Sequence, residues 1–129
     1  MKTAVNGGRL AVADKVFSWT LGMRKLARIS QSDGFLVSQI LNASLSAHLN
    51  LVEGNASIYP AEQLKFFSTS RASVAEALAG LEILVAEGRI RPQDADPLRL
   101  TGAEISRMLW GMIVAKQRTL APRPRAPHP

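Results

Sequence analysis

The stretch FLVSQILNASLSAHLNLVEG, residues 35–54, decides the fold because it is long, apolar and free of proline. Apolar residues recur along it every three or four positions, which places them on one side of a helix. Two such stripes are present: Val37, Leu41, Leu45, Leu49 and Val52 form one, and Leu36, Ile40, Ala43 and Ala47 flank it. The pattern predicts a helix from about Phe35 to Glu53. Gly54 suits the position just past a helix end, where left-handed backbone is cheap without a β-carbon.

Three further segments show the same helical spacing. They are predicted to be helices over about residues 10–29, 60–87, and 98 or 101 to 118. Their inward-facing residues are predicted to be Val12, Val16, Trp19, Met23, Leu26, Leu64, Phe67, Val74, Leu78, Leu81, Val85, Ile105, Met108, Leu109, Met112 and Ile113.

Residues that favour helix ends separate these segments. Pro60 suits a first helical turn, and Gly88 suits the end of the third helix. The acidic connection RPQDADP, residues 91–97, is predicted to lie between the third and fourth helices. Thr101, with Glu104 three residues later, matches a capping box at the start of the fourth helix.

Short connections between long amphipathic helices predict an all-α fold, an antiparallel up-down-up-down four-helix bundle. The 129-residue chain fits one domain, with the bundle over residues 1–118. Residues 119–129, TLAPRPRAPHP, carry four prolines and are predicted to form a disordered basic tail.

Composition argues against several classes of function. The chain has no cysteine, which argues against disulfides and thiol catalysis and suits a reducing cytoplasm. The start of the chain lacks the apolar run of a signal peptide, and no stretch reaches the roughly 20 apolar residues of a membrane span. With no phosphate-binding glycine loop, no G-x-S-x-G motif and two histidines, we expect no catalytic residues, cofactor or metal.

The net charge of +6 is unevenly distributed. Residues 1–115 contain 12 basic and 10 acidic side chains, a balance of +2. Residues 116–129 add four basic side chains and no acidic one. Most of the basic character therefore belongs to the tail, which weakens the inference from net charge to a nucleic-acid-binding domain.

Five short motifs, in order between about residues 35 and 90, resemble a family of bacterial four-helix-bundle proteins. That family was first noticed as reading frames inside intervening sequences of large-subunit ribosomal RNA genes. The motifs are LVSQI (36–40) for "LxSQI", NLVEG (50–54) for "NIAEG", Glu62 with Phe66 for "EFxxFL", SVAE (73–76) for "GSLAELE", and GRI (88–90) for "LGYI".

The resemblance implies a left-handed antiparallel bundle that assembles as a homopentameric ring. The chain is also distantly similar to the accessory protein of diversity-generating retroelements, a pentamer that binds nucleic acid and a reverse transcriptase through a basic surface. It departs from the family pattern at Leu41 and Asn42, where a basic pair is usual, at His48, where proline is usual, and at Leu78, which replaces a glutamate.

Polar residues within the second helix suggest a structural anchor. Asn50 and Glu53 are three residues apart and share a face, so they are predicted to tie helix two to the start of helix three. Arg71 is predicted to pair with Glu53 or Glu76. A metal or catalytic cluster around His48 is the weaker alternative, because bundles that bind two metal ions use Glu-x-x-His motifs and this chain has none.

Two groups of residues are candidates for binding partners. Arg24, Lys25 and Arg28 lie near the end of the first helix, where they can contact phosphate or simply complement the helix dipole. Trp110 lies about 140° around its helix from Ile105, outside the inward stripe. With other apolar residues that flank inward stripes, it predicts a subunit interface containing Phe66, Ile83, Trp110 and Val114.

The sequence therefore leaves three functions open. The first is a non-enzymatic homo-oligomer, pentameric as the resemblance implies, that scaffolds another protein. The second is an accessory factor that binds RNA or DNA weakly and without sequence preference, through a basic ring surface and the tail. An enzyme or metal carrier is a distant third, and no membrane partner is expected.

Overall fold

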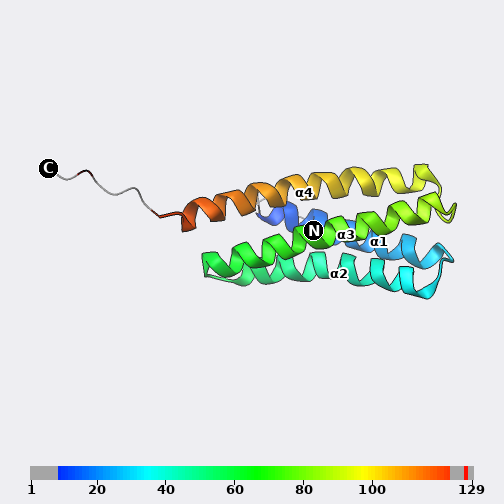
Figure 1. Ribbon diagram of the computed structural model, residues 1–129, viewed down its shortest axis with the longest axis horizontal. Coiled ribbons are helices and arrows are strands. Elements are labelled where there is room, and N and C mark those ends of the chain that lie inside the picture. Colours follow the sequence, from blue (N-terminus) through cyan, green and yellow to red (C-terminus); the bar gives the residue numbers. More distant parts are fainter. Residues whose placement is uncertain (1–8, 123–126, 128–129) are drawn as a thin grey trace.

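The computed structural model describes residues 9–122 and residue 127, and that part of the chain contains four α-helices and no strand. The helices are α1 (Arg9–Ile29), α2 (Gly34–Ala56), α3 (Pro60–Ala86) and α4 (Pro92–Leu120). Successive helices are joined at alternate ends of the molecule, as Figure 1 shows. The predicted all-α four-helix bundle is confirmed, and its left-handed twist stays a prediction.

The predictions for the two ends of the chain fall largely outside the described residues. Residues 1–8, which are not described, belong to the stretch for which no signal peptide is expected. Residues 123–126 and 128–129, also not described, make up most of the predicted tail. Helix α4 continues to Leu120, two residues beyond its predicted end at Arg118. The first two residues of the predicted tail, Thr119 and Leu120, are therefore helical.

Helices α1, α3 and α4 turn their predicted apolar stripes inward. Trp19 and Phe67 are the largest fully buried side chains. Every core-facing residue predicted on these three helices is either buried or packed half-buried against the core. Burial of these stripes against one another is the main force that holds the bundle together.

Of the two apolar stripes predicted on helix α2, the flanking one with smaller side chains is buried more fully. Its buried residues are mostly small, namely Ile40, Ala43, Ser44, Ala47, Leu51 and Gly54. Leu45, Leu49 and Val52 are exposed instead. Small side chains allow the backbones of neighbouring helices to approach closely. The stripe with the smaller side chains therefore faces α3, while Leu45, Leu49 and Val52 point outward.

Gly54 does not end α2, which continues to Ala56. Gly54 is buried inside the helix, and a β-carbon there would lie 2.6 Å from Phe67 Cε1 and 3.2 Å from Phe66 Cβ. Its role is therefore the close approach of α2 to α3, not a left-handed backbone. Gly88, by contrast, follows the end of α3 with a positive φ of 72°, as predicted.

Helix α4 begins at Pro92, earlier than predicted, and contains Pro97. Pro92 occupies the first helical turn, where a missing N–H costs nothing. Pro97 leaves unbonded only the carbonyl of Gln93, which is exposed and can accept from water. The predicted capping box is wrong, because Thr101 lies inside α4 and Glu104 forms an ion pair with Lys15 at 3.0 Å.

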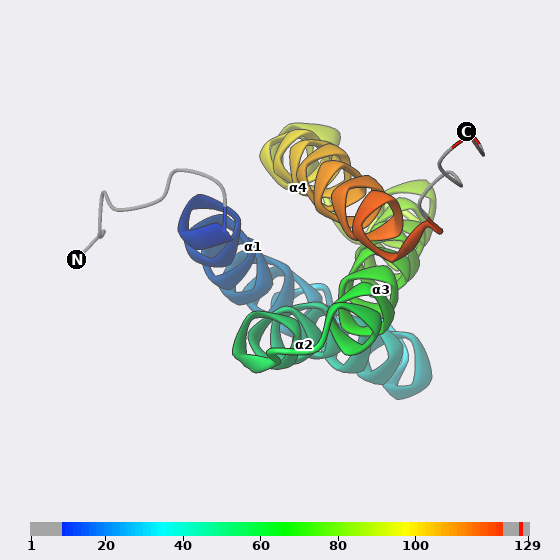
Figure 2. The same cartoon turned by 90° about the vertical axis from the view of Figure 1, so that its left-hand side faces the viewer.

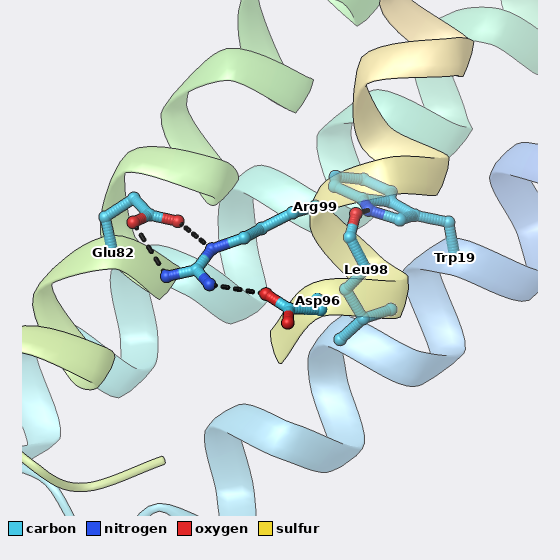
Figure 3. A network of polar contacts seen from close by, with 5 residues as sticks. All are labelled: Trp19, Glu82, Asp96, Leu98 and Arg99. Carbon is cyan, nitrogen blue, oxygen red and sulfur yellow. Dashed lines mark hydrogen bonds and ion pairs between the residues drawn. The ribbon is translucent and has the colours of Figure 1, made fainter. Parts of the chain in front are cut away.

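Polar contacts join the start of α4 to both of its neighbours, as Figure 3 shows. Arg99 bridges Asp96, at 2.7 Å between Nη1 and Oδ1, and Glu82 of α3, at 2.9 Å between Nη2 and Oε2. The hydrogen bonds from Arg99 lower the pKa of the Glu82 carboxyl. On the other side, the Trp19 indole N–H donates to the carbonyl of Leu98 at 3.1 Å. Because the ion pairs are exposed, they orient the helices more than they stabilise them.

Candidate functional site

An apolar surface lies on the outside of the groove between α1 and α2. It comprises Phe17, Leu21, Leu45, Leu49 and Val52, and is called the α1/α2 surface below. Each of these side chains is between 38% and 54% exposed. Leucines 45 and 49 and Val52 follow the helical i, i+4, i+7 spacing, and Phe17 and Leu21 are four apart. The five side chains therefore line adjacent outer faces of two packed helices.

Helix α2 has no charged residue from Gly34 to Val52, which is unusual for a helix with an exposed face. By length and composition alone it could cross a membrane, contrary to the expectation from sequence, and only 28% of its most apolar window is buried. Its outer face also carries Ser38, Gln39 and Asn42, which are exposed polar residues. The absence of charge along this exposed face matches the depletion of charged residues at the core of protein interfaces.

His48 lies at the junction of the two helices that form this surface. Its ring centroid is 5.4 Å from that of Phe17, at an interplanar angle of 58°. The Nδ1 atom is buried and has no hydrogen-bond partner within the described part of the chain. No group of three His, Asp or Glu side chains among the described residues could hold a metal ion. His48 therefore serves here as an aromatic contact between α1 and α2.

A second surface follows the groove between α3 and α4 and is called the α3/α4 groove below. Its floor and edges include the small side chains Ser68, Ala72 and Ala75 of α3, and Trp110 of α4. Trp110 is 49% exposed. The guanidinium carbon of Arg71 lies 5.0 Å from the centroid of the Trp110 ring, which is a cation–π geometry.

The four residues predicted to form an interface do not lie together. Trp110 lines the α3/α4 groove, and Val114, one turn further along α4, is half-buried. Phe66 is half-buried on the side of α3 that meets α2, next to Gly54. Ile83 is exposed near the far end of α3. Of these four residues, Trp110 alone lines the α3/α4 groove, since Phe66 helps to pack α2 against α3.

The predicted polar anchor is also corrected. Glu53 and Glu76 are exposed, and neither carboxylate has a hydrogen bond or ion pair to Arg71. Arg71 lies on the side of α3 that faces α4, and its Nε donates to the Ser106 carbonyl at 3.1 Å. Glu53 belongs to α2, on the opposite side of α3 from Arg71. Glu76 is on α3 itself, about 140° around the helix from Arg71. Neither carboxylate can therefore reach the guanidinium.

Short hydroxyl side chains provide the anchors that the sequence did not predict. The hydroxyl oxygens of Ser46 and Ser73 are 2.9 Å apart and join α2 to α3. The Ser70 hydroxyl donates to the Ala47 carbonyl at 2.6 Å, and Thr20 Oγ1 donates to the Ser44 carbonyl at 3.0 Å. Asn50 contributes indirectly, because its Nδ2 donates to the Ser46 carbonyl at 2.9 Å and to the Ser46 hydroxyl at 3.0 Å.

The basic cluster at the end of α1 is only partly free to bind a ligand. Arg24 Nη1 donates to the Leu41 carbonyl at 2.9 Å, so this side chain joins α1 to α2. Lys25 and Arg28 are exposed. Lys25 shares a shallow pocket with Arg89 and Arg91, a neighbourhood that was not predicted. Arg91 is already paired with Asp94, at 2.9 Å between Nε and Oδ2.

A comparison with models of known protein families shows to which family the chain belongs. Residues 10–111 match the 23S rRNA-intervening sequence protein family. The chain belongs to this family. The matched range contains all five residues of the α1/α2 surface, and it also contains Trp110. A search of the curated proteins finds no match.

A solved structure of similar fold supports the bundle. It is a crystal structure of a protein with unknown function from the S23 ribosomal protein family from Bacteroides thetaiotaomicron VPI-5482. The two chains superpose with a TM-score of 0.75 and are 20% identical. The alignment covers 79% of this chain and 97% of the other. At this identity the likeness establishes the fold of a family member and nothing about its partners.

Proposed function

We propose that this family member is a non-catalytic subunit of a homo-oligomer, a cytoplasmic assembly that scaffolds another macromolecule. The observation that carries the proposal is the α1/α2 surface, an exposed and uncharged apolar face on a helix with no charge over most of its length. Contiguous apolar patches on a folded subunit mark places where another molecule binds. The five-membered ring implied by the family resemblance is the assembly that we expect.

A second copy of the chain is a better occupant than lipid. A helix buried in lipid is apolar on all sides that face the bilayer, whereas α2 exposes Ser38, Gln39 and Asn42 beside its leucines. Protein interfaces accommodate such residues, since a partner can satisfy their hydrogen bonds. The α1/α2 surface is therefore assigned to contact between subunits.

The first test is to place a charge on this surface. We expect the wild-type chain to form a particle several times its 14.0 kDa subunit mass. Leu49→Glu should dissociate that particle, because an uncompensated charge at a packed interface costs about 3 kcal/mol or more, roughly a hundredfold in dissociation constant. Light scattering after size-exclusion chromatography measures the mass. Circular dichroism should show an intact helical subunit, since Leu49 is half exposed.

Gln93→Glu is the matched control, because it adds the same charge at an exposed position in the first turn of α4, outside the α1/α2 surface. It should leave the mass of the particle unchanged. A wild-type chain that is monomeric at micromolar concentration contradicts the proposal. If that monomer binds phosphatidylcholine vesicles and Leu49→Glu abolishes the binding, the surface contacts lipid instead.

A basic end of the bundle supports a second candidate, the accessory factor that binds nucleic acid. Lys25 and Arg28 of α1 lie at the same end as Arg89. Such contacts would be to phosphate and therefore independent of sequence. Repetition of this end around a ring, together with the basic tail, would concentrate the positive charge.

Salt dependence tests this second candidate. We expect weak binding of single-stranded RNA or DNA of random sequence, with affinity falling steeply as salt rises. Lys25→Gln with Arg28→Gln should lower the slope of log affinity against log salt by about one to two, since each lost phosphate contact removes roughly 0.7–0.9. Lys65→Gln with Arg107→Gln removes the same charge from other exposed positions and should change the slope less. Absence of retention at about 50 mM salt, where such contacts are strongest, rejects this function.

A further inference from the structure

The α3/α4 groove holds an arginine that is fixed in position but keeps one edge unused. Arg71 Nε donates to the Ser106 carbonyl at 3.1 Å, and its guanidinium carbon lies 5.0 Å from the centroid of the Trp110 ring. These two contacts orient the guanidinium plane. Its terminal nitrogens, Nη1 and Nη2, have no hydrogen bond or ion pair within the described part of the chain. Such a planar fork of N–H donors matches the two oxygens of a carboxylate.

The groove contains no negative charge to pair with this arginine. Arg71 is the one charged residue among the described residues that line it. Sites for nucleic acid, by contrast, align several basic side chains along the strand. A single fixed guanidinium with neutral walls therefore fits a single carboxylate surrounded by apolar groups, which is the chemistry of a protein segment.

Apolar surface lies directly beside the arginine. Ile113 is buried in the floor of the groove, Trp110 is half exposed, and Ala72 and Ala75 are exposed on α3. The hollow has a volume of about 340 Å³. This is at the lower end of the range of about 300–1,000 Å³ for ligand pockets, so it suits one or two side chains of a partner. Tryptophan and arginine are also the residues most enriched at the energetic centres of protein interfaces.

The groove is placed so that it can be filled while the α1/α2 surface is covered. In the end-on view of Figure 2, α3 and α4 lie on the side of the bundle opposite the place where α1 meets α2. A second copy would not supply the missing carboxylate through its α1/α2 surface, since none of those five side chains is charged. The tail of this chain, residues 119–129, contains two arginines and no acidic residue. Charge complementarity therefore favours a segment of a different protein.

We propose that the α3/α4 groove is a docking site for an acidic and apolar segment of a partner protein. The carboxylate of that segment pairs with Nη1 and Nη2 of Arg71, and its neighbouring apolar side chain packs on Trp110 and the alanines of α3. Gln117, which also lines the groove, offers an amide to the backbone of the segment. The inference rests on the proposed scaffold and names the chemistry of what it holds.

Selection from a library of random peptides with blocked ends, on the immobilised full-length chain, tests the proposal. We expect sequences in which Asp or Glu adjoins a large apolar residue. The best peptide is then compared with its amide analogue by fluorescence anisotropy. The analogue should bind about tenfold or more weakly, and Arg71→Gln should weaken the acidic peptide by a similar factor. Both changes together should cost no more than either alone, because they remove the same contact. Arg107→Gln removes the same charge from an exposed position of α4 that does not line the groove, and should bind like wild type.

Ala75→Glu is a second variant that keeps Arg71 in place. Position 75 lies four residues after Arg71 on α3, so the new carboxylate can pair with the guanidinium and compete with the peptide. It should weaken binding about tenfold or more while leaving the helical content intact. Thr69→Glu adds the same charge at an exposed position on the other side of α3 and should leave the affinity unchanged.

Three results would overturn the docking site. The first is a selection without acidic and apolar sequences, or binding that survives both Arg71→Gln and Ala75→Glu. The second is displacement of the peptide by single-stranded RNA of random sequence, which would show that the groove binds phosphate. The third is a smaller particle for Ala75→Glu in light scattering, which would assign the groove to contact between copies while the homo-oligomer stands. A monomeric wild-type chain that still binds the peptide through Arg71 would instead overturn the homo-oligomer and support the docking site.

Discussion

Trp19→Ala is expected to lower the free energy of unfolding by about 3–5 kcal/mol, the range for large aromatic side chains removed from a core. Trp19 is 1% exposed, and it is among the largest side chains buried in the bundle. Its removal leaves a cavity between α1 and α4 and also removes the hydrogen bond to the Leu98 carbonyl. Because domains of this size are stable by only about 5–15 kcal/mol, the loss is a large part of the total.

Denaturant unfolding followed by circular dichroism, at one fixed subunit concentration, measures this loss, since assembly contributes to apparent stability. Trp19→Phe is the matched variant, because it keeps most of the buried ring and loses the indole N–H. It should cost clearly less than Trp19→Ala. Equal costs would show that the hydrogen bond to Leu98, and not the volume of the ring, holds α1 against α4.

Much of the fold could be predicted because three of the helices carry a single apolar stripe each. For α1, α3 and α4 the spacing alone identified the buried side, including Trp19 and Phe67. Trp110 was correctly placed outside the core by the same argument. Helix α2 was harder because it carries two stripes, and periodicity cannot decide between them. Packing against α3 determines which stripe is buried, because small residues such as Ala47 allow α2 to approach Ser70 of α3 closely.

The α1/α2 surface escaped prediction for the same reason. With two apolar stripes on one helix, the spacing alone does not show which of them lies on the outside. The available signal was the absence of charge from Gly34 to Val52, because a helix that faces water usually carries some. Glu53 was misplaced for another reason, the expectation that it joins Asn50 in tying α2 to the start of α3. At the end of α2 it is exposed to solvent.

Gly54→Val is expected to lower the free energy of unfolding by about 2–3 kcal/mol, the usual cost of forcing extra carbons into a packed core. A β-carbon at Gly54 would lie 2.6 Å and 2.7 Å from Cε1 and Cδ1 of Phe67, whose ring is itself fully buried. The ring cannot move without opening the contact of α2 with α3. Gly111→Val is the control, since a β-carbon there meets nothing within 4 Å among the described residues. It should be neutral or slightly stabilising, because valine forms helix better than glycine.

A second change distinguishes this packing role from the left-handed helix end that the sequence predicted. Phe67→Leu shortens the side chain that meets position 54, and alone it destabilises by leaving space in the core. Combined with Gly54→Val it should cost less than the sum of the two single changes, because the new methyl groups occupy that space. Backbone strain at a left-handed residue would not respond to the size of a neighbour. Strictly additive costs would therefore show that conformation, not contact with Phe67, is what requires glycine at this position.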